Sequence, residues 1–340
     1  MKRSPLMNSC MVAARTAFAI AFLSAFSLPL ALAQDATAEP AVDAAADVST
    51  TDVMEPAAVP APQTTLERVR ATGNIRFGYR VDARPFSYRD ESGAAAGYTV
   101  ALCGKIAGQV KAELGLAALA VEWVPVTPDS RFSDLRDGRV DLLCGADTAS
   151  LSRRQDVSFS LPVFPGGIGA LVRSDAPARL QLVLEGRPLP DQVMWRANPA
   201  QVLQHKTFSA VAGSTAEAWL LKRIDVFDII AKVVTVDAYA AGVERVLNRS
   251  SDVLFGDRAI LLDAARHSGA GGDLKVLDRL FTVEPIALGL ARGDEDFRLL
   301  VDRALSGSYV ADDFGQLYAE TFGEPDERTL LFFQTVMLPE

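Results

Sequence analysis

A short apolar run, Val140–Cys144, leads through Gly145 into a polar segment, 146–154, that is rich in hydroxyls and ends in two arginines. The run is typical of a buried strand, which we predict to stop at Gly145. Loops and ligands gather at strand ends in α/β sheets, so hydroxyls and a guanidinium placed there indicate a carboxylate site. An ordinary exit loop with solvated arginines is the alternative.

The rest of the chain alternates strands and helices in the same way, which predicts an α/β fold. Apolar periodicity and turn residues predict strands at 75–79, 121–126, 168–173, 208–212, 233–236, 253–255 and 287–291, and helices at 65–73, 99–115, 134–138, 294–305 and 312–322. Residues 85–90 are predicted to form a turn region. Arg80, Arg131 and Arg153 each follow a strand, and three such arginines are harder to dismiss than one.

The first 63 residues are predicted to lie outside the folded part. Residues 1–33 have an early basic pair, an interrupted apolar run and a final Ala31-Leu32-Ala33, which is typical of a secretory signal peptide cleaved after Ala33. The alternative, a membrane span, fits less well because the apolar core is short and broken. Residues 34–63 are acidic and lack aromatic and basic residues, which predicts a disordered linker.

Composition limits the possible functions. The formal net charge of −9 argues against a nucleic-acid partner. Only His205 and His267 are present, so no histidine-centred nucleophile or metal cluster is proposed. After signal-peptide removal Cys103 and Cys144 remain, an even pair in an oxidising compartment; a disulfide is the preferred interpretation and two buried thiols the alternative.

Several motifs, in this order along the chain, resemble one family. They are Gly78-Tyr79-Arg80, Pro85-Phe86-Ser87-Tyr88, Gly97-Tyr98, Leu102-Cys103, the run from Glu122 to Thr127, Arg131, the segment from Asp141 to Arg153, and Asp156–Ser160. As a set they are similar to the periplasmic solute-binding proteins (family 3) of polar amino-acid ABC transporters, and most similar to the glutamate/aspartate-binding branch. The resemblance covers about residues 65–323.

The resemblance implies the type II fold of periplasmic binding proteins, in which two α/β lobes are joined by two hinge strands and hold a ligand in the cleft. Lobe 1 is expected to comprise residues 64–164 plus 287–340, and lobe 2 residues 165–286. An insertion at about 174–204, which contains Trp195, has no counterpart in the resemblance. The apolar tail from Leu330 to Phe333 is expected to pack on lobe 1 as core.

The resemblance also assigns ligand contacts. Arg153, with Thr148 and Thr215, is expected to bind the α-carboxylate, and Asp257 the α-ammonium. Ser214, in the turn before Thr215, and Tyr239 are the further ligand contacts that the resemblance implies. Ser214 and Asp257 also fit plain helix N-caps, Ser214 in a capping box with Glu217.

The side-chain end of the implied site is assigned to two further arginines. Arg80 and Arg131 match positions that bind a side-chain carboxylate, and two cations without an anion would be costly in a closed cleft. Three positions depart from the branch: Pro128 and Ala146 replace serines, and Tyr239 replaces a histidine.

The function expected from the resemblance is a periplasmic receptor that closes on an amino acid, first of all glutamate or aspartate, and delivers it to an ABC transporter permease in the inner membrane. We expect a monomer without a cofactor or metal. A dehydratase on the same fold, acting on a cyclohexadienyl substrate, is the enzymatic alternative; Asp147 and Asp237 are spare acids, but neither has a recognisable catalytic partner. A sensory binding protein without a transporter is a third possibility.

Overall fold

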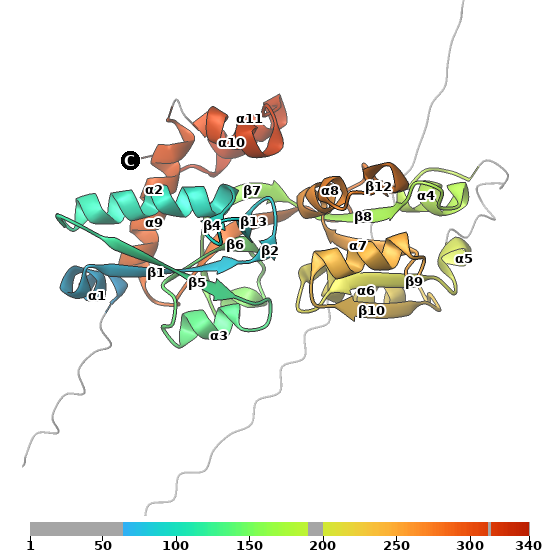
Figure 1. Ribbon diagram of the computed structural model, residues 1–340, viewed down its shortest axis with the longest axis horizontal. Coiled ribbons are helices and arrows are strands. Elements are labelled where there is room, and N and C mark those ends of the chain that lie inside the picture. Colours follow the sequence, from blue (N-terminus) through green and yellow to red (C-terminus); the bar gives the residue numbers. More distant parts are fainter. Residues whose placement is uncertain (1–63, 190–199, 312–313, 340) are drawn as a thin grey trace, which may run out of the picture. The chain divides into compact units, whose positions relative to one another are not determined.

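The computed structural model describes residues 64–189, 200–311 and 314–339. The predicted signal peptide, the predicted linker and Trp195 lie outside these residues. None of the helices in the described ranges is long and apolar enough to cross a membrane. Two five-stranded sheets, each covered by helices, organise the described chain into two lobes (Figure 1).

Lobe 1 is built on the sheet with strand order β5-β1-β6-β13-β7. Strand β1 pairs in parallel with β5 and β6, whereas β13 runs antiparallel to both β6 and β7. The bounds of its strands are β1 Asn74–Arg80, β5 Ala120–Val126, β6 Leu142–Thr148, β7 Ser158–Gly166 and β13 Glu284–Leu290. Its helices are α1 Thr65–Thr72, α2 Tyr98–Glu113, α3 Arg131–Arg136, the 3₁₀ turn η1 Arg153–Gln155, α9 Glu295–Tyr309, α10 Phe314–Phe322 and α11 Glu327–Val336.

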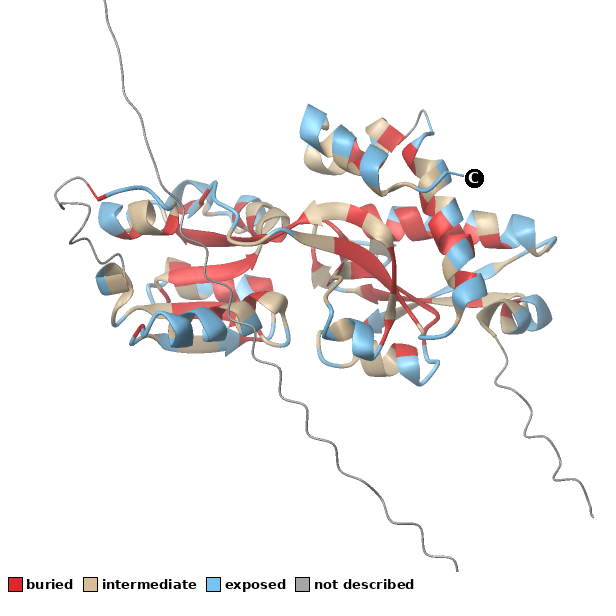
Figure 2. Cartoon of the chain, turned by 180° about the vertical axis from the view of Figure 1, so that it is seen from behind, coloured by how far each residue is buried: buried red, intermediate tan, exposed pale blue. Residues whose placement is uncertain are grey.

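The two faces of this sheet carry separate apolar clusters. Helices α2 and α9 pack on one face, and α3 packs on the other through Leu135 (Figure 1). Since side chains alternate along a strand, a sheet covered on both faces needs apolar residues at successive positions. Figure 2 shows that the inner strands are buried and that the helices combine buried with exposed residues.

Lobe 2 is built on the sheet with strand order β10-β9-β11-β8-β12. Its helices α4 and α6 pack on one face, and α7 and α8 pack on the other. The strands are β8 Ile168–Arg173, β9 Thr207–Val211, β10 Lys232–Val236, β11 Val253–Asp257 and β12 Leu274–Val276. The helices are α4 Ala178–Leu184, α5 Ala200–Leu203, α6 Thr215–Val226, α7 Tyr239–Leu247, α8 Arg258–His267 and the 3₁₀ turn η2 Gly271–Asp273.

The chain passes between the sheets twice, from β7 into β8 and back into β13. Gly166 and Gly167 form the first passage, and there is no room for side chains on them. A Cβ on Gly167 would lie 2.3 Å from the carbonyl oxygen of Thr282, and one on Gly166 would lie 2.8 Å from Asp257 Oδ2. The proposed lobe boundaries, 64–164 plus 287–340 and 165–286, stay predictions.

Cys103 in α2 and Cys144 in β6 form the predicted disulfide, so the preferred interpretation of the cysteine pair is confirmed. The bond fixes α2 to the central strand of lobe 1. Thr99 Oγ1 strengthens the same junction by donating to the carbonyl oxygen of Cys144 at 2.9 Å.

Three local predictions were wrong. Strand β6 does not stop at Gly145 but continues to Thr148, because β13 pairs with its end at Asp147 and Thr148. The turn region at 85–90 lies within a small sheet formed by β2 Asp82–Ala83, β3 Ser87–Arg89 and β4 Ala95–Ala96.

The third wrong prediction concerns the apolar tail in α11. Phe333 is buried against Tyr309 and Phe314, as expected for core. Leu330 and Leu331, however, are 45% and 60% exposed. A single helix can bury only one stripe of a continuous apolar run, so the other residues of the run stay in solvent.

Candidate functional site

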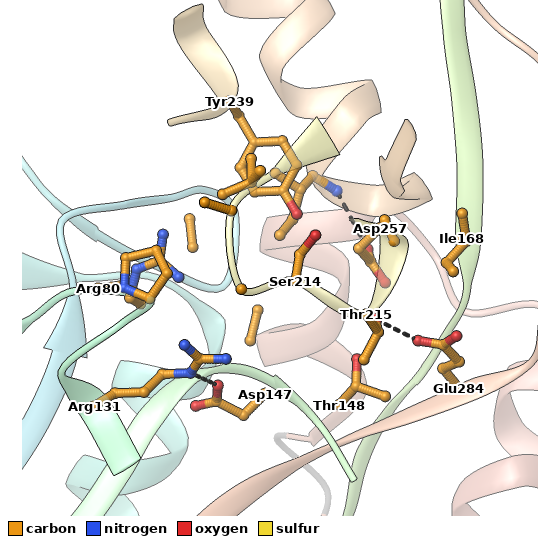
Figure 3. A pocket seen from close by; sticks show the side chains of 18 of the residues that line it. Arg80, Arg131, Asp147, Thr148, Ile168, Ser214, Thr215, Tyr239, Asp257 and Glu284 are labelled. Carbon is orange, nitrogen blue, oxygen red and sulfur yellow. Dashed lines mark hydrogen bonds and ion pairs between the residues drawn. The ribbon is translucent and has the colours of Figure 1, made fainter. Parts of the chain in front are cut away.

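One pocket is lined by all eight residues assigned to ligand binding from the sequence: Arg80, Arg131, Thr148, Arg153, Ser214, Thr215, Tyr239 and Asp257. Figure 3 labels all of them except Arg153. Lobe 1 contributes the ends of β1 and β6 together with α3 and η1. Lobe 2 contributes the β9–α6 turn, α7 and the end of β11. The cavity measures about 50 Å³, enough for a few water molecules.

Arg153 is the pocket cation whose contacts in the described chain include no carboxylate. Its Nη1 donates to the carbonyl oxygen of Thr148 at 3.0 Å, and its Nη2 donates to that of Gly213 at 3.2 Å. Burial, and next the nearby positive charge of Arg131, lower the pKa of Arg153. An anion beside this guanidinium would relieve both effects, so Arg153 is suited to a ligand carboxylate.

The start of α6 faces Arg153 from lobe 2. Ser214 is the N-cap, and its Oγ accepts from the backbone N–H of Glu217 at 3.2 Å. The reciprocal half of the predicted capping box is absent, because Glu217 Oε2 accepts instead from the backbone N–H of Gly213 at 2.8 Å. Ser214 therefore has the cap role expected from the sequence, while its side chain also lines the pocket.

Thr215 uses its only hydroxyl proton within the protein. Its Oγ1 donates to Glu284 Oε2 at 2.7 Å (Figure 3). A ligand carboxylate at this point must therefore replace Glu284 as the acceptor of the Thr215 hydrogen bond, or bind the backbone N–H groups that begin the helix.

Asp257 is a half-buried carboxylate held by three backbone donors. One oxygen accepts from Ala259 and Ile260, at 2.9 and 3.4 Å, and the other accepts from Gly167 at 3.2 Å. Burial raises the pKa of Asp257 to about 6 although these three hydrogen bonds act in the opposite direction. A ligand cation would favour the charged carboxylate, so both the N-cap role and an ammonium-binding role fit the geometry.

Tyr239 lines the same pocket as Asp257 (Figure 3). Its ring lies against Gly256, where a Cβ would come within 2.6 Å of Tyr239 Cε1. Burial, and next the charge of Asp257, raise the pKa of Tyr239 to about 12. The phenol is therefore neutral at physiological pH and is available as a hydrogen-bond donor.

Both arginines assigned to a side-chain carboxylate already have acidic partners. Arg131 Nε lies 2.6 Å from Asp147 Oδ1, and Arg80 Nη2 lies 2.6 Å from Asp82 Oδ1. The sequence suggests that these two arginines are unpaired and therefore need an acidic ligand. That prediction is wrong.

Sequence reasoning missed two acids at or beside the site, Asp82 and Glu284, and treated Asp147 only as a spare acid. Asp82 follows Arg80 by two residues, a spacing that could have suggested the pair. Asp237, the other spare acid, does not line the pocket. Within the described ranges, no three His, Cys, Asp or Glu side chains are grouped so that they could hold a metal ion.

The sequence matches the family "bacterial extracellular solute-binding proteins, family 3" over residues 75–324. The chain belongs to this family. The matched residues include every residue that lines the pocket. The pocket of this family 3 protein therefore lies entirely within the region that matches the family.

Three similar proteins illustrate its relatives. An L-glutamate/L-aspartate-binding protein of Pseudomonas aeruginosa is 26% identical over 77% of this chain and 80% of its own length. A cyclohexadienyl dehydratase of the same species is 28% identical over 37% of this chain and 44% of its own length. The crystal structure of an ancestral amino acid-binding protein, AncCDT-1, described as a precursor of cyclohexadienyl dehydratase, has a TM-score of 0.62 at 22% identity and covers 76% of this chain and 99% of its own.

Proposed function

We propose that this family 3 protein is a periplasmic receptor that captures a polar α-amino acid and delivers it to an ABC transporter permease in the inner membrane. One observation carries the proposal: a single pocket contains Arg153, a cation that pairs with no carboxylate of the described residues, and the half-buried carboxylate of Asp257. An amino acid has the complementary pair of charges.

The proposed binding mode follows from these groups. The α-carboxylate takes the place of the carbonyl oxygens at Arg153 and receives hydrogen bonds from the start of α6. The α-ammonium binds Asp257, and Glu284 also lines the pocket. Because Arg153 comes from lobe 1 and Asp257 from lobe 2, full binding requires the lobes to close around the ligand, a hinge mechanism.

The preference for glutamate or aspartate, expected from the resemblance, is supported by the named relatives. It is not supported by the pairing of Arg80 and Arg131 with internal acids. We therefore define the ligand class here as a polar amino acid.

The proposed compartment and partner rest on the family and on the disulfide. Family 3 proteins are extracellular solute-binding proteins, and the Cys103–Cys144 bond suits an oxidising compartment. Transport rather than sensing is the function we propose, with the protein acting as a monomer.

A dehydratase-type activity is the second candidate. A carboxyl with its pKa raised to about 6, as for Asp257, can donate a proton near neutral pH. The partial similarity to a cyclohexadienyl dehydratase adds to this candidate.

A thermal-shift screen of the mature protein against the twenty amino acids, prephenate and arogenate separates the two functions. A ligand at about 100 times its Kd should stabilise the native state by roughly 2.7 kcal/mol. We expect a shift with at least one polar amino acid and no turnover of either cyclohexadienyl compound. Turnover of prephenate or arogenate, without a thermal shift for any amino acid, would contradict the receptor function and support the dehydratase instead.

A further inference from the structure

The ion pair between Arg131 and Asp147 lies at the end of the pocket assigned to the ligand side chain. The Nε–Oδ1 distance is 2.6 Å, and the two side chains are only 5% and 4% exposed. The Arg131 guanidinium also lies 4.2 Å from the centre of the Phe132 ring. The pair is thus a fixed, buried part of the pocket wall.

Gly145 leaves the space that Asp147 occupies. A Cβ at position 145 would lie 3.1 Å from Asp147 Oδ2 and 3.4 Å from Arg80 Cγ. The second carboxylate oxygen of Asp147 therefore lies above the glycine, on the side from which Arg80 approaches. Arg80 is held in turn by Asp82, with Nε and Nη2 at 3.0 and 2.6 Å from Oδ1.

A count of charges then disfavours an anionic side chain. The cations that line the pocket are Arg80, Arg131 and Arg153, and its anions are Asp147, Asp257 and Glu284. The α-carboxylate of the ligand uses Arg153 and its ammonium uses Asp257. Arg131 is then neutralised by Asp147, and Arg80 by Asp82 beside the pocket, while Glu284 adds a further negative charge. A carboxylate placed at this end would lie beside Asp147 and would find the charge of both arginines already balanced by acids, and like charges in a buried site repel strongly.

An amide side chain fits the same end without that repulsion. Figure 3 shows the two terminal nitrogens of Arg131 extending beyond the Nε that bonds Asp147. An amide oxygen can accept from those nitrogens, while the amide NH₂ can donate to Asp147 Oδ2. Both halves of the ion pair are then hydrogen-bonded to an uncharged group.

We propose that Asp147 determines specificity by directing the pocket toward glutamine or asparagine and against glutamate or aspartate. This inference rests on the proposed amino-acid receptor and names the side-chain class of its ligand. Asp147 acts by holding Arg131 and by contacting the ligand amide directly.

The test is titration calorimetry of the wild-type protein and of Asp147→Asn with glutamine, asparagine, glutamate and aspartate. The wild type should bind one of the amides at least about tenfold more tightly than the matching acid. Asp147→Asn keeps an acceptor for Arg131 Nε but removes the negative charge, so it should reduce or reverse that ratio by about tenfold or more. Asp175→Asn is the matched control, since Asp175 pairs with Arg173 and Arg249 outside the pocket, and it should leave the ratio unchanged.

The outcomes separate this inference from the function on which it rests. Tighter binding of the acids by the wild type, tight binding of some other amino acid alone, or an unchanged ratio in a folded Asp147→Asn would overturn the inference and leave the receptor standing. The wild-type ratio decides the question even if Asp147→Asn does not fold. Failure to bind any amino acid would overturn the receptor itself.

Discussion

Asp257 combines a structural and a proposed binding role at one carboxylate. Its three backbone donors make it the N-cap of α8 and join it to the passage at Gly167. Burial raises its pKa to about 6 in the ligand-free protein. In the proposed binding mode only the charged carboxylate forms an ion pair with the ammonium, so the charge state of Asp257 should control ligand affinity.

Ligand affinity should therefore depend on pH through Asp257. A carboxyl whose pKa is raised on folding binds its proton more tightly in the folded state. Its contribution to stability is therefore greatest below its ordinary pKa of 3.8 and falls as the pH rises toward 6. Ligand binding has the opposite slope: affinity should be full well above pH 6 and about tenfold weaker at pH 5.

Calorimetric titrations at pH 5 and pH 8 measure this dependence. Asp257→Asn should bind weakly at both pH values and should lack the slope. Equal affinity of the wild type at the two pH values would show that the ammonium is held elsewhere.

The sequence predicted which residues line the pocket better than it predicted which of them form ion pairs with each other. The resemblance named Arg131 and the geometry of the strand end suggested Thr148, and both line the pocket. Whether Arg131 was free depended on Asp147, sixteen residues away, whose side chain leaves β6 beside Thr148. Sequence position does not reveal such a contact, because it depends on how α3 packs against the strand.

At the scale of elements, β6 shows how pairing overrides a local signal. Glycine often ends a strand, and Gly145 was predicted to end β6. Pairing with β13 instead extends β6 to Thr148 and thereby orients Asp147 and Thr148. The alternation of strands and helices gave the α/β class because it depends on local periodicity. The end of β6 could not be predicted, because its partner strand is more than a hundred residues away in the chain.

The passage at Gly167 predicts a destabilising substitution. A Cβ there would meet the Thr282 carbonyl oxygen at 2.3 Å, so Gly167→Ala should cost about 1–3 kcal/mol of unfolding free energy. Gly108→Ala is the matched control: Gly108 lies within α2 with open space around its Cβ position, and the change should stabilise by about 0.5–1 kcal/mol.

Urea unfolding monitored by circular dichroism measures both variants. A midpoint for Gly167→Ala equal to or above that of the wild type would mean that the backbone at the passage can yield, and that the close approach to Thr282 is not a constraint.

At the scale of the whole molecule, side-chain contacts outside the pocket also join the two lobes. Arg84, which follows β2 in lobe 1, lies 3.4 Å from Asp263 Oδ2 in α8 of lobe 2. Its Nη2 also lies 3.4 Å from His267 Nε2. None of the three residues lines the ligand pocket. The group can therefore stabilise closure without touching a ligand.

Arg84→Ala should increase the dissociation rate of a bound amino acid about two- to fivefold, because a partly exposed ion pair contributes roughly 0.2–1 kcal/mol. Stopped-flow fluorescence measures that rate. Arg249→Ala removes an arginine whose partner, Asp175, lies in the same lobe, and should leave the rate unchanged. Identical rates for Arg84→Ala and the wild type would remove this ion pair from the mechanism of closure.

The central claim is that Arg153 receives the carboxylate of an amino acid in this pocket. Its most direct test is calorimetric titration of Arg153→Ala beside Arg154→Ala, which removes the neighbouring exposed arginine that does not line the pocket. With the amino acid that binds the wild type most tightly, we predict about a hundredfold loss of affinity for Arg153→Ala, or about 3 kcal/mol, and wild-type affinity for Arg154→Ala. Wild-type affinity in a folded Arg153→Ala would contradict the claim.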